Sequence, residues 1–78
     1  MQKIPEAGQR YRHYKRGGEY VIIGIARHSE TEGEMVIYQA QYADAEFPLG
    51  QLWARPLEMF LEELEYEGKM VPRFQRLD

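Results

Sequence analysis

The run from Tyr20 to His28 constrains the fold of this chain more than any other feature. Valine and isoleucine, whose branched side chains favour strands, dominate it, and apolar residues occupy both of its faces. A strand that is apolar on both faces is typical of the centre of a small, closed sheet. Gly24 interrupts the run and predicts a bend or a β-bulge there. The sequence therefore predicts a mainly β protein built around this strand.

Four further strands are predicted on the two sides of this run. They span residues 8–15, 35–42, 51–54 and 70–77. The second of them is predicted to be half-buried, because its alternate residues form two sides. One side is Val36, Tyr38, Ala40 and Tyr42, and the other is Met35, Ile37, Gln39 and Gln41. The paired glycines within Arg16 to Glu19 predict a hairpin turn, and Tyr66 to Lys69 predicts a tight turn. The stretch from Ala43 to Gly50, with its acidic residues and proline, predicts a mobile loop.

One helix is predicted between the fourth and fifth strands. Leu57, Phe60, Leu61 and Leu64 follow at positions i, i+3, i+4 and i+7, and Pro56 suits the first position of a helix. This spacing predicts a short helix of two turns near residues 56–64, with an apolar stripe that caps the sheet.

Length and composition indicate a single domain over residues 1–78, of which residues 1–7 are expected to be a flexible N-terminal arm. Hydrophobic residues make up 44% of the chain and charged residues 29%, which is the range of ordinary globular domains. The chain has no cysteine, which favours a reducing, cytoplasmic environment. It also has no apolar run approaching the roughly 18 residues of a membrane span, so no membrane association is expected.

Several short motifs resemble a known family. They are Tyr11-Arg12-His13-Tyr14-Lys15 with Gly17-Gly18 and Tyr20, then Ala26 to Thr31, then Val36-Ile37-Tyr38, then Trp53 to Phe60. In this order they resemble a family of small, mostly bacterial proteins of unknown function. The resemblance implies a five-stranded SH3-like barrel in a free-standing cytoplasmic protein, and it implies no reaction. The stretch from Ala43 to Gln51 is longer than in the form associated with the family.

A group of polar and aromatic residues is the candidate binding surface. Its members are Tyr11, His13, Arg27, His28, Trp53 and Arg55. Aromatic and arginine side chains dominate binding hot spots, and SH3-like barrels use such grooves for extended peptides or nucleic-acid strands. A purely structural interpretation stays open: Trp53 would fill the core, Arg55 would pair with a carboxylate, and Arg27 would pair with Glu58 or Glu62.

The first functional hypothesis is a non-enzymatic binding module that recognises a protein or peptide segment. The net charge of -3 and the pI near 5.4 favour a protein partner over nucleic acid. A nucleic-acid-binding module remains an alternative, because the first sixteen residues are basic. Their positive charges are Lys3, Arg10, Arg12, Lys15 and Arg16.

The second alternative is a small metal-dependent enzyme that uses His13 and His28, which a hairpin around Gly17 and Gly18 would bring near each other. Imidazole with nearby carboxylates suits zinc or iron, but two histidines at this spacing match no known ligand pattern. The sequence therefore predicts no catalytic residue, no metal site and no cofactor. Gly17-Gly18 also lacks the spacing of a phosphate-binding loop.

Overall fold

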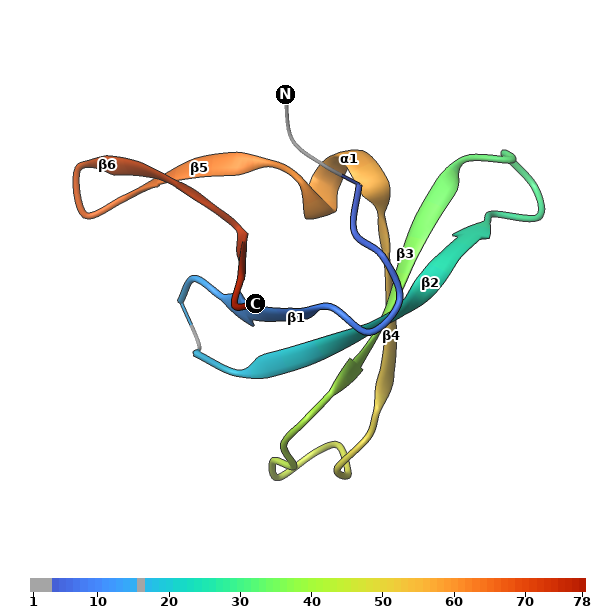
Figure 1. Ribbon diagram of the computed structural model, residues 1–78, viewed down its shortest axis with the longest axis horizontal. Coiled ribbons are helices and arrows are strands. Elements are labelled where there is room, and N and C mark those ends of the chain that lie inside the picture. The colour runs from blue at the N-terminus through green and yellow to red at the C-terminus, as the bar shows by residue number, and fades with distance from the viewer. Residues whose placement is uncertain (1–3, 16) are drawn as a thin grey trace.

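A computed structural model of the protein describes residues 4–15 and 17–78. The described residues form seven strands and one helix (Figure 1). The strands are β1 (Arg10–His13), β2 (Glu19–Arg27), β3 (Glu34–Ala40), β4 (Leu52–Pro56), β5 (Glu63–Tyr66), β6 (Lys69–Pro72) and β7 (Phe74–Arg76), and the helix is α1 (Leu57–Phe60). Five strands form an antiparallel sheet in the order β4-β3-β2-β1-β7, and β5 pairs with β6 in a separate hairpin. The prediction of a mainly β fold with a short helix is confirmed.

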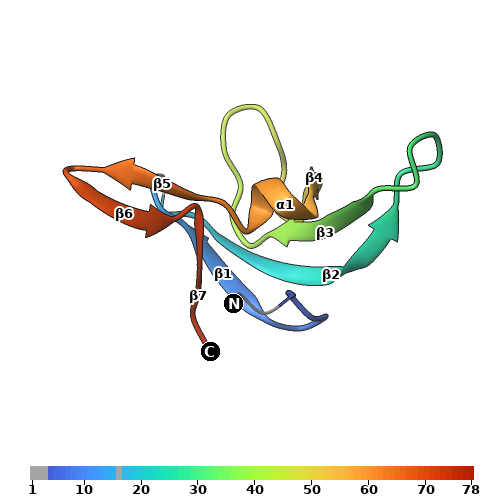
Figure 2. The same ribbon diagram turned by 90° about the horizontal axis from the view of Figure 1, so that it is seen from above.

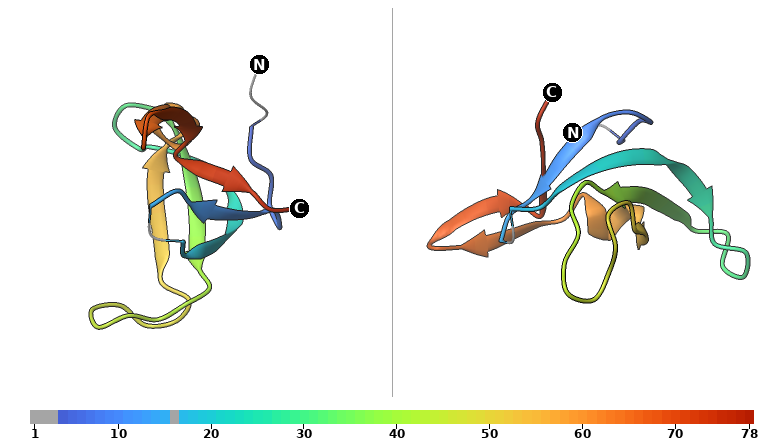
Figure 3. Two further views of the ribbon diagram at one scale, coloured as in Figure 1. Left: turned by 90° about the vertical axis from the view of Figure 1, so that its left-hand side faces the viewer. Right: turned by 90° about the horizontal axis from the view of Figure 1, so that it is seen from below.

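The five-stranded sheet is curved, so that it has a concave and a convex side. Figure 2 shows β4, β3, β2 and β1 following one another across the curve. The helix α1, the loop between β3 and β4, and the β5–β6 hairpin all project from the concave side (Figure 3). The core therefore forms on that side alone.

Strand alternation places the core residues on the concave face. In the register of the sheet Tyr20 lies opposite both Tyr11 and Ala40, and Ile22 lies opposite Tyr38. The buried apolar residues are Tyr11, Tyr20, Ile22, Val36, Tyr38, Ala40, Phe60 and Phe74. From α1, the Phe60 ring stacks on the Phe74 ring of β7, with centroids 4.3 Å apart. Five of these eight residues are aromatic, and the contact of Phe60 with Phe74 joins the helix to the last strand.

Strand β2 departs from the prediction in its second half. The register with β3 shifts between Ile22 and Gly24, so the predicted bulge is confirmed. Beyond it, Ile23 is 46% exposed and Ile25 is 37% exposed, whereas Ile22 is 1% exposed. The prediction of two buried faces is therefore wrong in this half of the strand. Ile23 is exposed on the convex side, and Ile25 is exposed although it lies opposite the buried Val36 on the concave side.

The helix is shorter than predicted. It ends at Phe60, and Pro56 precedes it with an extended backbone instead of occupying the first helical position. Leu64 lies in β5, because Glu67 and Gly68 adopt positive φ values of 52° and 81° and close a tight β5–β6 hairpin. This turn was predicted, but strand β5, which begins within the range predicted to be helical, was not. Leu57 and Leu61 still pack against the core, as expected of the apolar stripe.

The predicted final strand over residues 70–77 is divided into β6 and β7. Arg73 lies between them and forms an ion pair with Glu62 at 2.6 Å, while its amide donates to the Glu62 carbonyl at 2.9 Å. The chain therefore turns at Arg73, so that β7 leaves the hairpin and pairs with β1.

The start of the chain packs against the sheet from its first described residues. Of the arm expected over residues 1–7, residues 1–3 lie outside the described residues, and Pro5 is buried. The Gly8 amide then donates to the Ile22 carbonyl at 2.8 Å. No helix in the described ranges is long and apolar enough to cross a membrane.

The neighbouring residues Ile22 and Ile23 test the one-sided core. We expect Ile22→Val to lower the free energy of unfolding by about 1 kcal/mol, because it removes a buried methylene group. The same change at Ile23, where the side chain is half in water, should cost less than about 0.5 kcal/mol. Urea denaturation of both variants measures the difference. Equal losses would show that the convex face is covered as well.

Candidate binding groove

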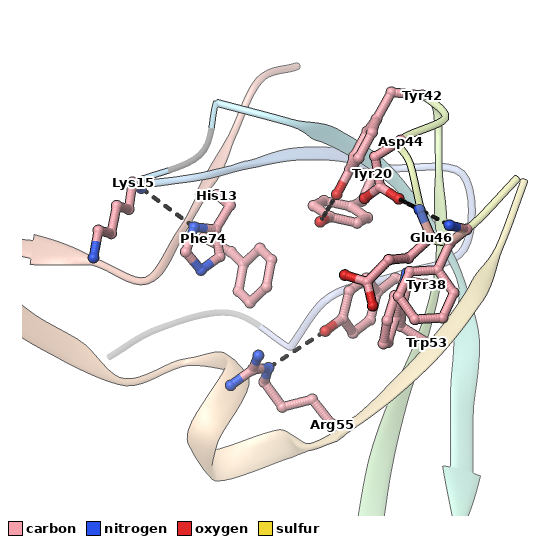
Figure 4. A pocket seen from close by; sticks show the side chains of 11 residues that line it. His13, Lys15, Tyr20, Tyr38, Tyr42, Asp44, Glu46, Trp53, Arg55 and Phe74 are labelled. Carbon is pink, nitrogen blue, oxygen red and sulfur yellow. Dashed lines mark hydrogen bonds between the residues drawn. The ribbon is translucent and has the colours of Figure 1, made fainter. Parts of the chain in front are cut away.

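The concave face of the sheet is not fully covered, and a groove of about 750 Å³ remains there (Figure 4). The helix covers one part of the face through Phe60, and the β3–β4 loop borders the other part. Aromatic side chains make up most of the groove wall: Tyr20, Tyr38, Tyr42, Phe47, Trp53 and Phe74. The charged or ionisable side chains are His13, Lys15, Asp44, Glu46 and Arg55.

The register of β3 with β4 determines which way Trp53 and Arg55 point. Trp53 lies opposite Tyr38, and Arg55 lies opposite Val36. Since paired residues of an antiparallel sheet share a face, both side chains project to the concave side with the buried residues of β3. Trp53 is nevertheless 36% exposed, so the interpretation of Trp53 as the centre of the core is wrong. Phe47 packs edge-on against it, with ring centroids 4.9 Å apart.

Arg55 reaches across the groove from one edge strand towards the other. Its Nε donates to the Tyr38 hydroxyl at 3.3 Å, and its guanidinium carbon lies 5.5 Å from the centre of the Phe74 ring. The positive charge is attracted to the face of this ring. In the part of the chain that the structure describes, no carboxylate forms an ion pair with Arg55. The prediction of a carboxylate partner for Arg55 is therefore wrong.

His13 and Lys15 border the groove at the end of β1. The Lys15 amide donates to His13 Nδ1 at 3.2 Å, which favours the neutral tautomer with the proton on Nε2. The imidazole also lies edge-on to Phe74, with centroids 5.2 Å apart. These contacts fix the orientation of the His13 ring beside the groove (Figure 4).

Two tyrosines link the start of β2 to the start of the β3–β4 loop. The hydroxyls of Tyr20 and Tyr42 lie 2.5 Å apart in a hydrogen bond. The Tyr42 ring lies so close to Gly18 that a Cβ atom built there would be 2.5 Å from Tyr42 Cε1. Tyr20, Tyr42 and Phe74 line the groove but were not among the predicted site residues. The predicted alternation had nevertheless placed Tyr42 on the same face as Tyr38.

A turn centred on Asp44 shapes the rim of the groove that the β3–β4 loop forms. Asp44 Oδ1 accepts hydrogen bonds from the Glu46 amide at 2.9 Å and the Phe47 amide at 2.8 Å. Such a turn is the usual way in which an aspartate side chain holds a loop. It fixes Glu46 and Phe47 at the groove, within the segment predicted to be a mobile loop.

Three of the six predicted site residues do not reach the groove. Tyr11 is buried in the core, where it packs edge-on against Phe60, and burial raises the pKa of its phenol. Arg27 ends β2, and its guanidinium donates to the Glu32 carbonyl instead of pairing with Glu58 or Glu62 as predicted. His28 begins the turn between β2 and β3, and its Nδ1 accepts hydrogen bonds from two backbone amides. The groove therefore contains only His13, Trp53 and Arg55 of the predicted set.

The two histidines lie at opposite ends of β2. This strand has nine residues, so it separates them by about 30 Å. The expectation that the hairpin brings His13 and His28 near each other is therefore wrong. Among residues 4–15 and 17–78, no group of three or more His, Cys, Asp or Glu side chains is arranged to hold a metal ion.

Two arginines of the basic N-terminal segment pair with carboxylates. Arg12 lies 3.1 Å from Glu19, and Arg10 lies 3.7 Å from Asp78. The Arg10 amide also donates to the Asp78 carboxylate, and this bond is the main reason that the pKa of Asp78 is lowered. These pairs reduce the positive charge that β1 presents to a polyanion.

The fold and the groove together define a small mainly β domain with an aromatic groove on the concave face of its sheet. The chain belongs to the DUF1653 family, a family of proteins of unknown function, whose model matches residues 9–76. It is similar to the crystal structure of a family member from Bordetella bronchiseptica, with a TM-score of 0.77 and 35% identity. That match covers 92% of this chain and 86% of the other. No curated protein matches the chain. The resemblance to a family of unknown function is confirmed.

Substitutions at Gly18 and Gly24 test how closely the Tyr42 ring packs against the β1–β2 turn. We expect Gly18→Ala to destabilise the protein by about 1–3 kcal/mol, because the new methyl group must displace the Tyr42 ring. At Gly24 a Cβ atom meets nothing within 4 Å, so Gly24→Ala should change stability by no more than about 1 kcal/mol in either direction. Thermal unfolding of both variants measures the contrast, and an equal effect would contradict the close contact.

Proposed function

We propose that this protein is a non-enzymatic binding module that recognises an extended segment of another protein in its aromatic groove. The observation that carries the proposal is the state of Trp53 and Arg55. Trp53 is 36% exposed in a folded domain, and Arg55 points into the groove without a carboxylate partner among the described residues. Both are residue types on which protein recognition depends most.

The groove is held in shape before any partner arrives. Tyr20 and Tyr42 are joined through their hydroxyls, Asp44 fixes the β3–β4 loop, and Arg55 contacts Tyr38 and Phe74. Side chains that are already ordered lose little conformational entropy when a ligand binds. A preformed aromatic wall with a few fixed polar groups is the usual character of a binding site.

The interpretation of the fold as an SH3-like barrel is part of this proposal. It is supported by the curvature of the five-stranded sheet and by the contact of Arg55 on one edge strand with Phe74 on the other. SH3-like barrels bind extended segments on aromatic surfaces of this kind.

A protein partner suits the charges of the groove better than nucleic acid does. Asp44 and Glu46 both line it, and carboxylates repel phosphate groups. On the protein itself, Arg10 pairs with Asp78 and Arg12 pairs with Glu19. We propose no enzymatic role, because the length of β2 separates His13 from His28.

The test begins with selection of peptides from a random display library of about 12 residues on the folded protein, followed by synthesis of the tightest binder. Trp53 is the only tryptophan of the chain, so its fluorescence reports on the groove directly. We expect peptide binding to change this emission. Replacement of Arg55 by alanine should weaken binding by about tenfold or more, as the loss of a hot-spot residue does.

Arg27→Ala is the matched control. It removes one arginine charge from the end of β2, outside the groove, and should leave the affinity for the peptide unchanged. A large fall in the melting temperature of Arg55→Ala would instead indicate that Arg55 acts mainly through its contacts with Tyr38 and Phe74. Equal loss of affinity in both variants would place the binding surface elsewhere and overturn the proposal.

A further inference from the structure

Strand β4 is an edge of the sheet that the described residues leave uncovered. It pairs with β3 on one side only, and it is the first strand in the order of the sheet. Leu52 is 52% exposed, and Ala54 is exposed as well. An exposed edge strand presents unpaired amides and carbonyls that another extended chain can join.

The backbone direction of β4 identifies the groups at this edge. The Ala40 amide donates to the Gln51 carbonyl at 2.9 Å, so Gln51 faces β3. Alternate residues of a strand direct their amides and carbonyls to the same side, so Trp53 and Arg55 also face β3. Leu52 and Ala54 therefore direct their amides and carbonyls away from the sheet. Consistent with this, the Leu52 carbonyl accepts a bond from the Gln51 side chain and none from β3.

The side chains beside this edge are those of the groove. Trp53 and Arg55 are two positions apart and share the concave face, so their Cα atoms are separated by about 7 Å. Successive same-face side chains of an added strand have the same spacing. A segment that paired with β4 would therefore place one side chain beside Trp53 and the next same-face side chain beside Arg55.

The charge on β4 itself indicates what that segment must carry, since Arg55 lies on this strand whereas Asp44 and Glu46 lie in the β3–β4 loop. Arg55 offers a planar guanidinium that recognises a carboxylate better than any other group in a peptide. Strand β4 itself, Leu-Trp-Ala-Arg-Pro, contains no acidic residue. A second copy that paired through the same edge would therefore bring no carboxylate of β4 to Arg55. The other short edge, β7, has three residues and is a poorer template.

We propose that an extended segment of another protein adds to the sheet as a strand beside β4, bonded to the backbone of Leu52 and Ala54. The segment carries an aspartate or glutamate opposite Arg55 and a large apolar residue two positions away, opposite Trp53. Its recognition sequence is thus an apolar and an acidic residue separated by one position. This inference rests on the proposed binding function and specifies its ligand and geometry.

Amide hydrogen exchange of the full-length protein, with and without the selected peptide, tests the strand addition. We expect exchange at Leu52 and Ala54 to slow by about tenfold or more at saturation, because these amides acquire acceptors. The amides of Trp53 and Arg55 are the internal controls, since β3 already bonds them and their exchange should change much less. Unchanged exchange at Leu52 and Ala54 in a saturated complex would overturn the inference.

The acidic residue is tested by a double-mutant cycle. Replacement of the acidic residue of the peptide by its amide should weaken binding to the wild type by about tenfold. With the Arg55→Gln variant the same change in the peptide should have little effect, because its charge no longer has a partner. Equal losses for both proteins would show that the carboxylate does not meet Arg55.

The outcomes separate this inference from the proposed function. A peptide that changes Trp53 emission without protecting the β4 amides would support the groove and overturn the added strand. If the amides of Leu52 and Ala54 are protected from exchange without peptide, and the protection depends on protein concentration, the added strand belongs to a second copy of the chain. That result would contradict the inference that a segment of another protein binds there. Failure of the selection to give any peptide that alters Trp53 emission would contradict both proposals.

Discussion

The position of Phe74 is the constraint on which the rest of the structure depends. Its ring stacks on Phe60 of α1 and contacts His13, Tyr20 and Tyr38 edge-on. Strand β7, which carries it, has three residues and pairs only with β1. The aromatic contacts of this one side chain therefore hold the last strand and the helix against the concave face of the sheet.

The groove is a consequence of the same packing. One turn of helix brings Phe60 onto one part of the concave face, and the chain then leaves in the β5–β6 hairpin instead of extending the cover. The remaining part of the face leaves Trp53 and Phe47 exposed, and Arg55 of one edge strand lies over the Phe74 ring of the other. The helix covers only part of the concave face, so Trp53 stays exposed there. Ile23 is exposed on the convex face of the sheet.

Particular residues show how far the sequence led. Strand β3 was predicted correctly because Val36, Tyr38 and Ala40 fall on alternate positions and so share one face, and the bulge before Gly24 was predicted because glycine interrupts a strand pattern. The helix was overestimated because Leu64 fits its spacing, although a tight turn at Glu67 and Gly68 recruits that residue to a strand. Residue type and local spacing were informative, but they did not decide between the helix and the hairpin at Leu64; the pairing of β5 with β6 decided it.

For the site, the sequence by itself determined the residue types: an arginine, a tryptophan and several tyrosines placed on strands. The tertiary structure alone decided which of them meet. His13, Trp53 and Arg55 converge because β1 and β4 curl towards each other, whereas Arg27 and His28 are carried away on the far end of β2. Strand periodicity fixes the face on which a side chain lies, but its position along and across a curved sheet depends on register. Register in turn depends on contacts between residues far apart in the chain, such as Arg55 with Phe74.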